Sequence, residues 1–103
     1  TIEMPVFTNN KSRVKTSILM DDLVLFSFEK EVKKGLQYLE YNAQVNEDKI
    51  VKYQRLLNER KGKDEEKIMV EKAKNGSYYL MEGTYKIRLE KDGEVEEKEL
   101  VLE

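Results

Sequence analysis

The chain has 103 residues, of which 39% are hydrophobic and 39% are charged, with 19 basic and 21 acidic side chains. This length and balance predict a single domain over residues 1–103, with a compact core under a heavily charged surface. The chain contains neither histidine nor cysteine, which excludes imidazole bases, thiol nucleophiles, disulfides and zinc sites built from these residues. No apolar run approaches the ~18 residues of a membrane span, so no membrane association is expected.

The first elements along the chain are an arm and a strand. Residues 1–12 are predicted to form an irregular or extended arm, because Pro5 excludes a helix interior there. Residues 13–63 follow as a part that mixes strands and helices. This part opens with a short strand over 13–18, in which polar and apolar residues alternate. The apolar face of this strand would carry Val14, Thr16 and Ile18.

Residues 21–34 have helix signals at both ends. A carboxylate of Asp21 or Asp22 can cap the first turn. Gly35 follows a basic last turn, in the position that ends many helices. We therefore predict a helix here. A buried strand over residues 23–28 is the alternative, because this apolar run contains good strand formers.

The next segment combines a strand with a second helix. Apolar residues alternate with polar ones over 36–45, which predicts a strand. Asn46 can act as the N-cap of a helix over 46–61, which contains no proline or glycine and ends on basic residues. The apolar stripe of this helix is Ile50, Tyr53 and Leu57. The alternative is a strand over the same residues.

After the second helix the period of the apolar residues changes to two, which predicts an antiparallel β-meander over 67–102. Its expected strands are 67–73, 78–81, 84–91 and 94–102. The strongest turn signals between them are Asn75-Gly76 and Asp92-Gly93, because these dipeptides favour two-residue hairpin turns.

The Asp92-Gly93 turn also predicts the register of the last hairpin. With these two residues at the centre of the turn, opposite charges meet on the outer face and apolar groups meet at the base. The predicted pairs are Lys91 with Glu94, Arg88 with Glu97, Lys86 with Glu99 and Tyr85 with Leu100. Because Ile87 and Leu89 then face charged residues, the tip of the hairpin is expected to project beyond the core.

Together these elements predict an α+β fold, in which one or two helices pack on one face of a mainly antiparallel sheet that ends in the β-meander. The alternative is an all-β sandwich or barrel, which would follow if both predicted helices were strands. No motif in the chain is specific enough to indicate a family.

No pattern in the chain indicates catalysis. The five glycines are isolated, so they form no glycine-rich phosphate loop. Asp21 and Asp22 could bind a cation, but a helix cap is the simpler interpretation. Nothing singles out a pair of carboxylates for acid–base chemistry. We therefore expect no enzyme activity, no catalytic residues, no metal site and no cofactor.

The leading hypothesis is a small non-enzymatic protein-binding module, such as an inhibitor, an adaptor or an assembly component. Tyrosine is common at recognition surfaces, and neighbouring residues of a strand point to opposite faces. One of two adjacent tyrosines would therefore be exposed if only one face of the sheet is covered. The predicted partner-binding residues are Tyr78, Tyr79, Met81, Lys86 and Arg88. A sheet covered on both faces, or a surface for self-association, is the alternative explanation.

Two other functions remain as alternatives. A nucleic-acid-binding protein would use the basic residues Lys11, Arg13, Lys15, Lys52 and Arg55. The acidic balance of the chain argues against this function. The other alternative is a structural subunit that forms a homo-oligomer through an open sheet edge. The sequence does not determine the cellular compartment, and the cytoplasm is the favoured prediction.

Overall fold

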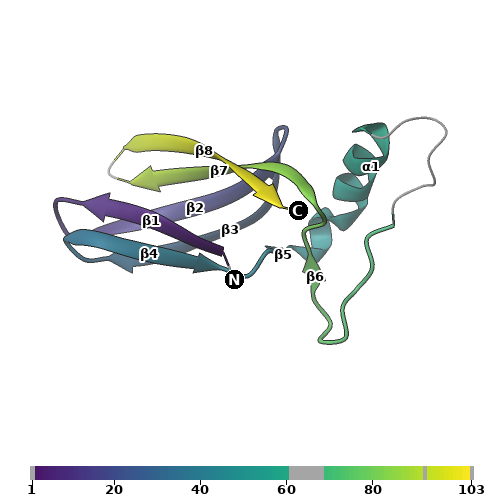
Figure 1. The fold of residues 1–103 in the computed structure, drawn as a ribbon, viewed down its shortest axis with the longest axis horizontal. Coiled ribbons are helices and arrows are strands. Elements are labelled where there is room, and N and C mark those ends of the chain that lie inside the picture. The colour runs from purple at the N-terminus through teal and green to yellow at the C-terminus, as the bar shows by residue number, and fades with distance from the viewer. Residues whose placement is uncertain (1, 61–68, 92, 103) are drawn as a thin grey trace.

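Figure 1 shows the computed structural model, which describes residues 2–60, 69–91 and 93–102. The fold over these residues is α+β, with eight strands in antiparallel sheets and one helical segment. The strands are β1 (Ile2–Thr8), β2 (Ser12–Met20), β3 (Leu23–Val32), β4 (Gly35–Tyr41), β5 (Gln44–Val45), β6 (Tyr78–Tyr79), β7 (Gly83–Lys91) and β8 (Glu94–Leu102). The helical segment is a 3₁₀ turn, η1 (Glu47–Lys49), that runs directly into α1 (Ile50–Arg60).

β1 and β4 form a two-stranded antiparallel ladder that lies in front of β2 and β3 (Figure 1). The chain passes from β1 to β2 through residues 9–11, and from β3 to β4 through residues 33–34. Both connections lie at the same end of the molecule, which we call the turn end. Thr8 Oγ1 donates a hydrogen bond to the carbonyl oxygen of Lys33 at 2.9 Å, and this bond ties the two connections together.

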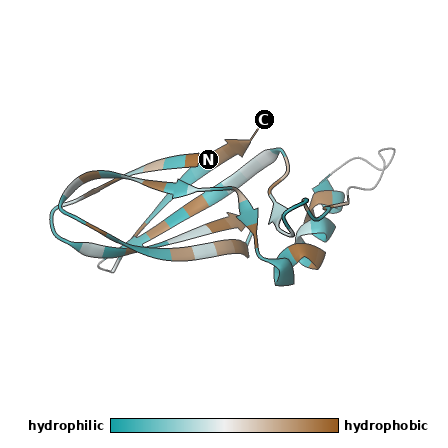
Figure 2. Ribbon diagram, turned by 90° about the horizontal axis from the view of Figure 1, so that it is seen from below, coloured by the Kyte–Doolittle hydropathy of each residue, from teal (hydrophilic) through white to brown (hydrophobic). Residues whose placement is uncertain are grey.

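The second sheet has four strands in the order β3-β2-β7-β8. The core lies between the inner face of this sheet and the inner face of the β1–β4 ladder. Alternate residues of the strands are buried there, as the period of two requires, and hydrophobic and hydrophilic residues accordingly alternate along the strands in Figure 2. The buried side chains include Met4, Val6, Val14, Ile18, Leu39, Ile87 and Leu89.

The helix predicted over 46–61 is confirmed within the described residues. It lies at the end of the molecule opposite the turn end (Figure 1). Tyr53 and Leu57 of its predicted apolar stripe are buried. Asn46 occupies the N-cap position, but its side chain makes no capping hydrogen bond. Its backbone N–H instead donates to the carbonyl oxygen of Leu25 at 2.9 Å, which fixes the start of the helical segment against β3.

Most of the predicted irregular arm is a strand, because β1 covers residues 2–8 and β2 begins at Ser12. Pro5 lacks a backbone N–H, but β1 has only β4 as a neighbour in its ladder, and such edge strands tolerate proline. The strand forms because it pairs with the distant strand β4, from Thr8 with Gly35 to Ile2 with Tyr41, and the local sequence does not indicate this pairing.

The helix predicted over 21–34 is wrong, and the alternative of a strand is correct. Asp21 has a φ of 54°, a conformation that aspartate tolerates, and it helps to close a two-residue turn between β2 and β3. A shift in the register of these strands between Ile18 and Leu19 accompanies the complete burial of Leu25. Pairing with the adjacent strand β2 therefore outweighs the local helix signals.

The strand predicted over 36–45 is divided into β4 and β5. Ala43 interrupts it with a φ of 63°. The short strand β5 pairs with β6, so β6 extends neither β7 nor the four-stranded sheet.

The C-terminal run of strands is present, although its first predicted strand is not. Residues 69–73 form no strand, and the start of the predicted strand over 67–73 lies outside the described residues. The chain turns here, but the Gly76 N–H donates to the carbonyl oxygen of Ala73 at 2.9 Å, so Lys74 and Asn75 lie at the centre of the turn instead of the predicted Asn75-Gly76 pair.

The last hairpin has the predicted register. Lys91 lies opposite Glu94, and the three other predicted pairs follow in step. Asp92 lies outside the described residues, and Gly93 has a φ of 80°, as a tight hairpin turn requires. The expected projection of the tip is wrong for β7, because β7 also pairs with β2. Ile87 and Leu89 are consequently buried, whereas the facing residues of β8 are exposed.

Candidate functional site

Tyr78 and Tyr79, which the sequence singles out as binding residues, lie on β6 and are both half-buried. Tyr79 Oη accepts a hydrogen bond from Asn75 Nδ2 at 2.7 Å. Lys72 Nζ lies 5.7 Å from the centre of the Tyr78 ring. Contacts within the chain thus hold both rings, and they leave less aromatic surface for a partner than an open sheet face would.

Met81 takes part in a ring of three hydrogen bonds near α1. Its backbone N–H donates to Tyr53 Oη at 2.9 Å, and Tyr85 Oη donates to its carbonyl oxygen at 2.6 Å. The two tyrosine hydroxyls lie 2.5 Å apart, so the Tyr53 hydroxyl completes the ring by donating to Tyr85 Oη. The ring of hydrogen bonds joins α1 to β7 and to Met81 in the connection that precedes β7.

Tyr41, Tyr53 and Tyr85, which we call the tyrosine cluster, are all buried. Burial raises the pKa of Tyr85, and its hydrogen bond with Tyr53 adds to this effect. Burial also raises the pKa of Tyr41, with a further contribution from the nearby Tyr53. The Tyr41 hydroxyl donates to the carbonyl oxygen of Gln44 at 2.6 Å. Every hydroxyl of the cluster therefore has a partner, as buried polar groups require, and the cluster supports the fold.

The remaining predicted binding residues, Lys86 and Arg88, lie on β7, in a different sheet from β6. Arg88 Nε contacts Glu97 Oε2 at 3.0 Å, and Lys86 lies opposite Glu99 in the ladder. The structure therefore places the five predicted residues on two sheets and on the connection between β6 and β7, where Met81 lies, and the charged ones face carboxylates of their own chain.

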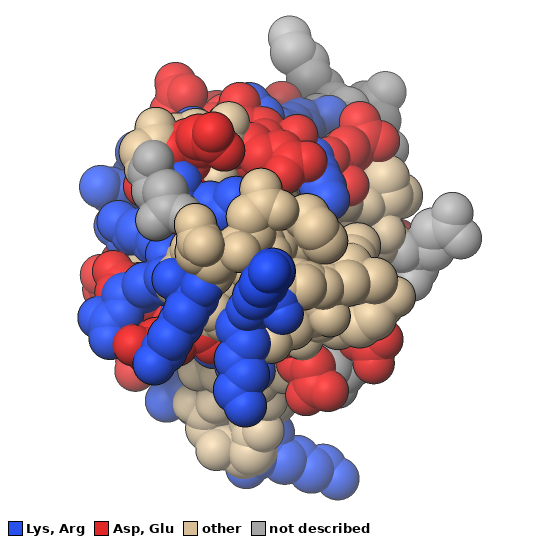
Figure 3. Space-filling view, turned by 90° about the vertical axis from the view of Figure 1, so that its left-hand side faces the viewer, with Lys and Arg blue, Asp and Glu red and all other residues tan. Residues whose placement is uncertain are grey.

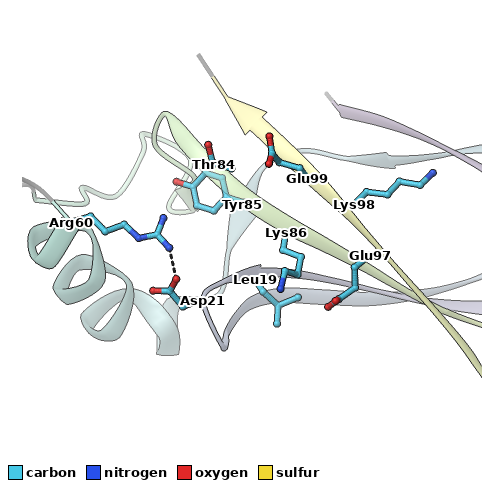
Figure 4. Close-up of a pocket in the computed structure, with 9 residues that line it drawn as sticks. All are labelled: Leu19, Asp21, Arg60, Thr84, Tyr85, Lys86, Glu97, Lys98 and Glu99. Carbon is cyan, nitrogen blue, oxygen red and sulfur yellow. Dashed lines mark hydrogen bonds and ion pairs between the residues drawn. The ribbon is translucent and has the colours of Figure 1, made fainter.

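A cleft of about 400 Å³ lies between α1 and the hairpin of β7 and β8 (Figure 4). Arg60 of α1 contacts Asp21 of the β2–β3 turn at 2.5 Å on its wall. The rest of the lining includes Lys86, Glu97, Lys98 and Glu99. Positive and negative side chains are thus mixed around the cleft, and their arrangement selects no ligand of one charge.

The basic residues of the nucleic-acid alternative are also divided. The set is Lys11, Arg13, Lys15, Lys52 and Arg55. Lys11 lies in the connection before β2, and Arg13 and Lys15 lie in the first half of β2, whereas the last two are exposed on α1 at the other end of a molecule 51 Å long (Figure 1). Lys11 and Arg13 contact Glu31 and Glu29, at 3.8 and 3.4 Å. The structure therefore does not bring these residues into one basic surface.

The outer face of the β1–β4 ladder carries a group of exposed apolar side chains. Phe7 is 61%, Leu36 60% and Tyr38 55% exposed. The ladder pairs Phe7 with Leu36 and Pro5 with Tyr38. Residues that are paired in this way point to the same side of a ladder. The four side chains are therefore neighbours, and we call Pro5, Phe7, Leu36 and Tyr38 the apolar face.

Opposite charges border the apolar face at its two ends. Lys33 and Lys34 are exposed and directly precede β4 at the turn end of the molecule. We call these two lysines the basic end of the ladder. Glu3 lies opposite Glu40 at the other end of the ladder, and both are exposed; we call this pair the acidic end. Figure 3 looks onto the turn end and shows Lys and Arg side chains beside an uncharged surface.

The apolar face was absent from the sequence prediction because β1 was expected to be irregular. The available signal was the alternation within residues 2–8, where Met4 and Val6 point inward and Pro5 and Phe7 point outward. Read as a strand, this segment leaves a proline and a phenylalanine on the solvent side. Only its pairing with β4 adds Leu36 and Tyr38 to them.

The described part of the chain contains no helix long and apolar enough to cross a membrane. Its acidic side chains form no group of three or more that could hold a metal ion. No protein-family model matches the sequence, and neither the curated proteins nor the solved structures include a match.

Proposed function

We propose that the protein is a non-enzymatic protein-binding module, and that it binds through the apolar face of the β1–β4 ladder. The observation that supports this proposal is the exposure of Phe7, Leu36 and Tyr38, each more than half open to solvent and adjacent to the others. Contiguous exposed apolar side chains with a polar rim are typical of surfaces that bind other proteins, and aromatic side chains are enriched there.

The outer face of the four-stranded sheet is less suited to binding a partner than the apolar face. On the four-stranded sheet, Arg13 contacts Glu29 and Arg88 contacts Glu97. Cross-strand partners thus already match the charges on that surface. The half-buried Tyr78 and Tyr79 offer less exposed aromatic area than the apolar face. We therefore move the proposed docking surface from β6 and β7 to β1 and β4.

A photo-crosslinking side chain at position 38 tests the proposal in extract of the cells that make the protein. The matched control carries the same side chain at position 51, because Val51 is 73% exposed but lies on α1, away from the ladder. We expect a discrete protein adduct from position 38 and none from position 51.

A second variant makes this test specific to the apolar face. Phe7→Ser should abolish the adduct at position 38, because the pair formed by Phe7 is the next pair to that of Tyr38 on the same face of the ladder. Equal adducts from positions 38 and 51, or no protein adduct from position 38, would overturn the proposal.

A further inference from the structure

We infer that the partner that the apolar face fits is a second copy of the chain, an inference that rests on the proposed function. In order along β4, the exposed Lys33 and Lys34 of the basic end come just before the strand, the apolar face follows, and the acidic end comes last. A surface with this order is complementary to itself when it is turned around. A two-fold symmetric pair uses the same patch on both subunits, so it requires such self-complementarity.

The charges select one of the two ways in which two such ladders can face each other. With the two-fold axis parallel to the strands, each basic end would meet the other basic end. With the axis across the strands, Lys33 and Lys34 of each copy meet Glu3 and Glu40 of the other. The strands of the two copies then run in opposite directions, with β1 over β1 and β4 over β4.

The spacing of the charges agrees with this arrangement. The centre of the apolar face lies at Gln37, between the pairs formed by Leu36 and Tyr38. Glu40 and Lys34 are each three residues from this centre, which corresponds to about 10 Å in either direction at ~3.3 Å per residue. When the centres of two copies coincide, the acidic end of one therefore falls on the basic end of the other.

The open edge of β8 is a poorer surface for self-association. An antiparallel pair of β8 strands centred on Lys98 would place Glu97 opposite Glu99 twice, and such facing like charges are destabilising. Glu96 and Lys98 lie opposite the buried Leu89 and Ile87, and charges on the inner side of an edge strand discourage pairing. The face of the ladder is therefore a better surface for self-association than the edge of β8.

The size of the face sets the strength of the association. A ladder of seven residue pairs covers only a few hundred Å² on each copy, at about 3.3 Å per residue and 4.8 Å between strands. Stable interfaces bury roughly 800 Å² on each partner. We therefore expect a weak dimer that exchanges rapidly at micromolar to millimolar concentrations and weakens as salt screens its charges.

Sedimentation equilibrium with charge-reversal variants tests this inference on the full chain. The first variant, Lys33→Glu with Lys34→Glu, makes both ends acidic. The second, Glu3→Lys with Glu40→Lys, makes both ends basic. Each alone should raise the dimer dissociation constant by about tenfold or more, because like charges then meet across the interface. Mixed in equal amounts, the two variants should form a heterodimer at least as tight as the wild-type dimer.

The control variant, Lys52→Glu with Arg55→Glu, changes the net charge as much as the first variant but lies on α1. It should leave the dissociation constant within about twofold of wild type, since distant surface sites act independently. Far-UV circular dichroism verifies that each variant is folded. The restored affinity in the mixture cannot arise from unfolding.

A wild-type protein that stays monomeric at millimolar concentration would overturn the inference. So would charge variants whose dimer affinity is unchanged, or a mixture of variants that stays as weak as each alone. The photo-crosslink separates this failure from failure of the proposed function. An adduct with another protein at position 38 would support the protein-binding module but not the dimer. The absence of any adduct would contradict both proposals.

Discussion

Tyr38 and Tyr41 are three residues apart on β4, yet they belong to two regions with opposite surroundings. Tyr41 is 2% exposed and donates its hydroxyl to the carbonyl oxygen of Gln44. Tyr38 is 55% exposed on the apolar face, and its hydroxyl forms no hydrogen bond with a described residue. One side of the ladder thus uses aromatic side chains to hold the fold together, and the other leaves them available for contact.

The largest expected effect is a difference in the free energy of unfolding between substitutions on the buried side and on the exposed side. Tyr53→Ala should lower the free energy of unfolding by about 3–5 kcal/mol, because it leaves a cavity where a fully buried ring now packs. Tyr38→Ala should change it by less than about 0.5 kcal/mol, as surface substitutions usually do. Urea denaturation monitored by circular dichroism measures both. Similar losses for the two variants would show that the apolar face belongs to the core.

The sequence predicted the elements whose pairing is local. The register of β7 and β8 follows from a turn dipeptide and from charges that meet within twenty residues of one another. The helix over 46–61 follows from its apolar stripe and from the absence of glycine and proline. In both cases the residues that determine the structure lie within the element or next to it.

Two other strands were not predictable in the same way: β3 because its local signals conflict with its pairing to the adjacent β2, and β1 because its partner is distant in the chain. The local signals of β3 fit a helix at each end, and only its pairing with β2 makes it a strand. β1 contains a proline, and two other strands, β2 and β3, separate it in the chain from its partner β4. The candidate site depends on this last pairing, because the apolar face takes half of its residues from each strand. Sequence reasoning therefore placed the site on β6 and β7, where contacts within the chain occupy much of the surface.

A smaller effect is expected when the comparison is restricted to hydroxyl groups. Tyr85→Phe keeps the ring but removes the donor to the Met81 carbonyl and the acceptor for the Tyr53 hydroxyl. Buried polar groups left without partners cost about 1–3 kcal/mol of stability. Tyr38→Phe is the matched control and should be nearly neutral. Chemical denaturation of the two variants provides the measurement, and a neutral Tyr85→Phe would contradict the hydrogen-bonded ring.

The smallest expected effect, also in the tyrosine cluster, depends on pH. The pKa of Tyr85 and that of Tyr41 are raised above the usual value near 10, mainly by burial, so the unfolded chain loses these protons first. The stability that this difference provides is complete below pH 10 and declines as the pH rises further. At pH 10.5 we expect a loss on the order of 1 kcal/mol relative to pH 9.

Urea denaturation of wild type and variants between pH 8.5 and 11 measures this decline. Tyr41→Phe should make the decline shallower, because the folded and unfolded states then differ by one fewer titrating group. Tyr38→Phe is the matched control, at an exposed position of the same strand. An equal change in slope for the two variants would contradict the separation of the ladder into a stabilising and a contacting side. A change confined to Tyr41→Phe would confirm that burial on the inner side causes the alkaline sensitivity.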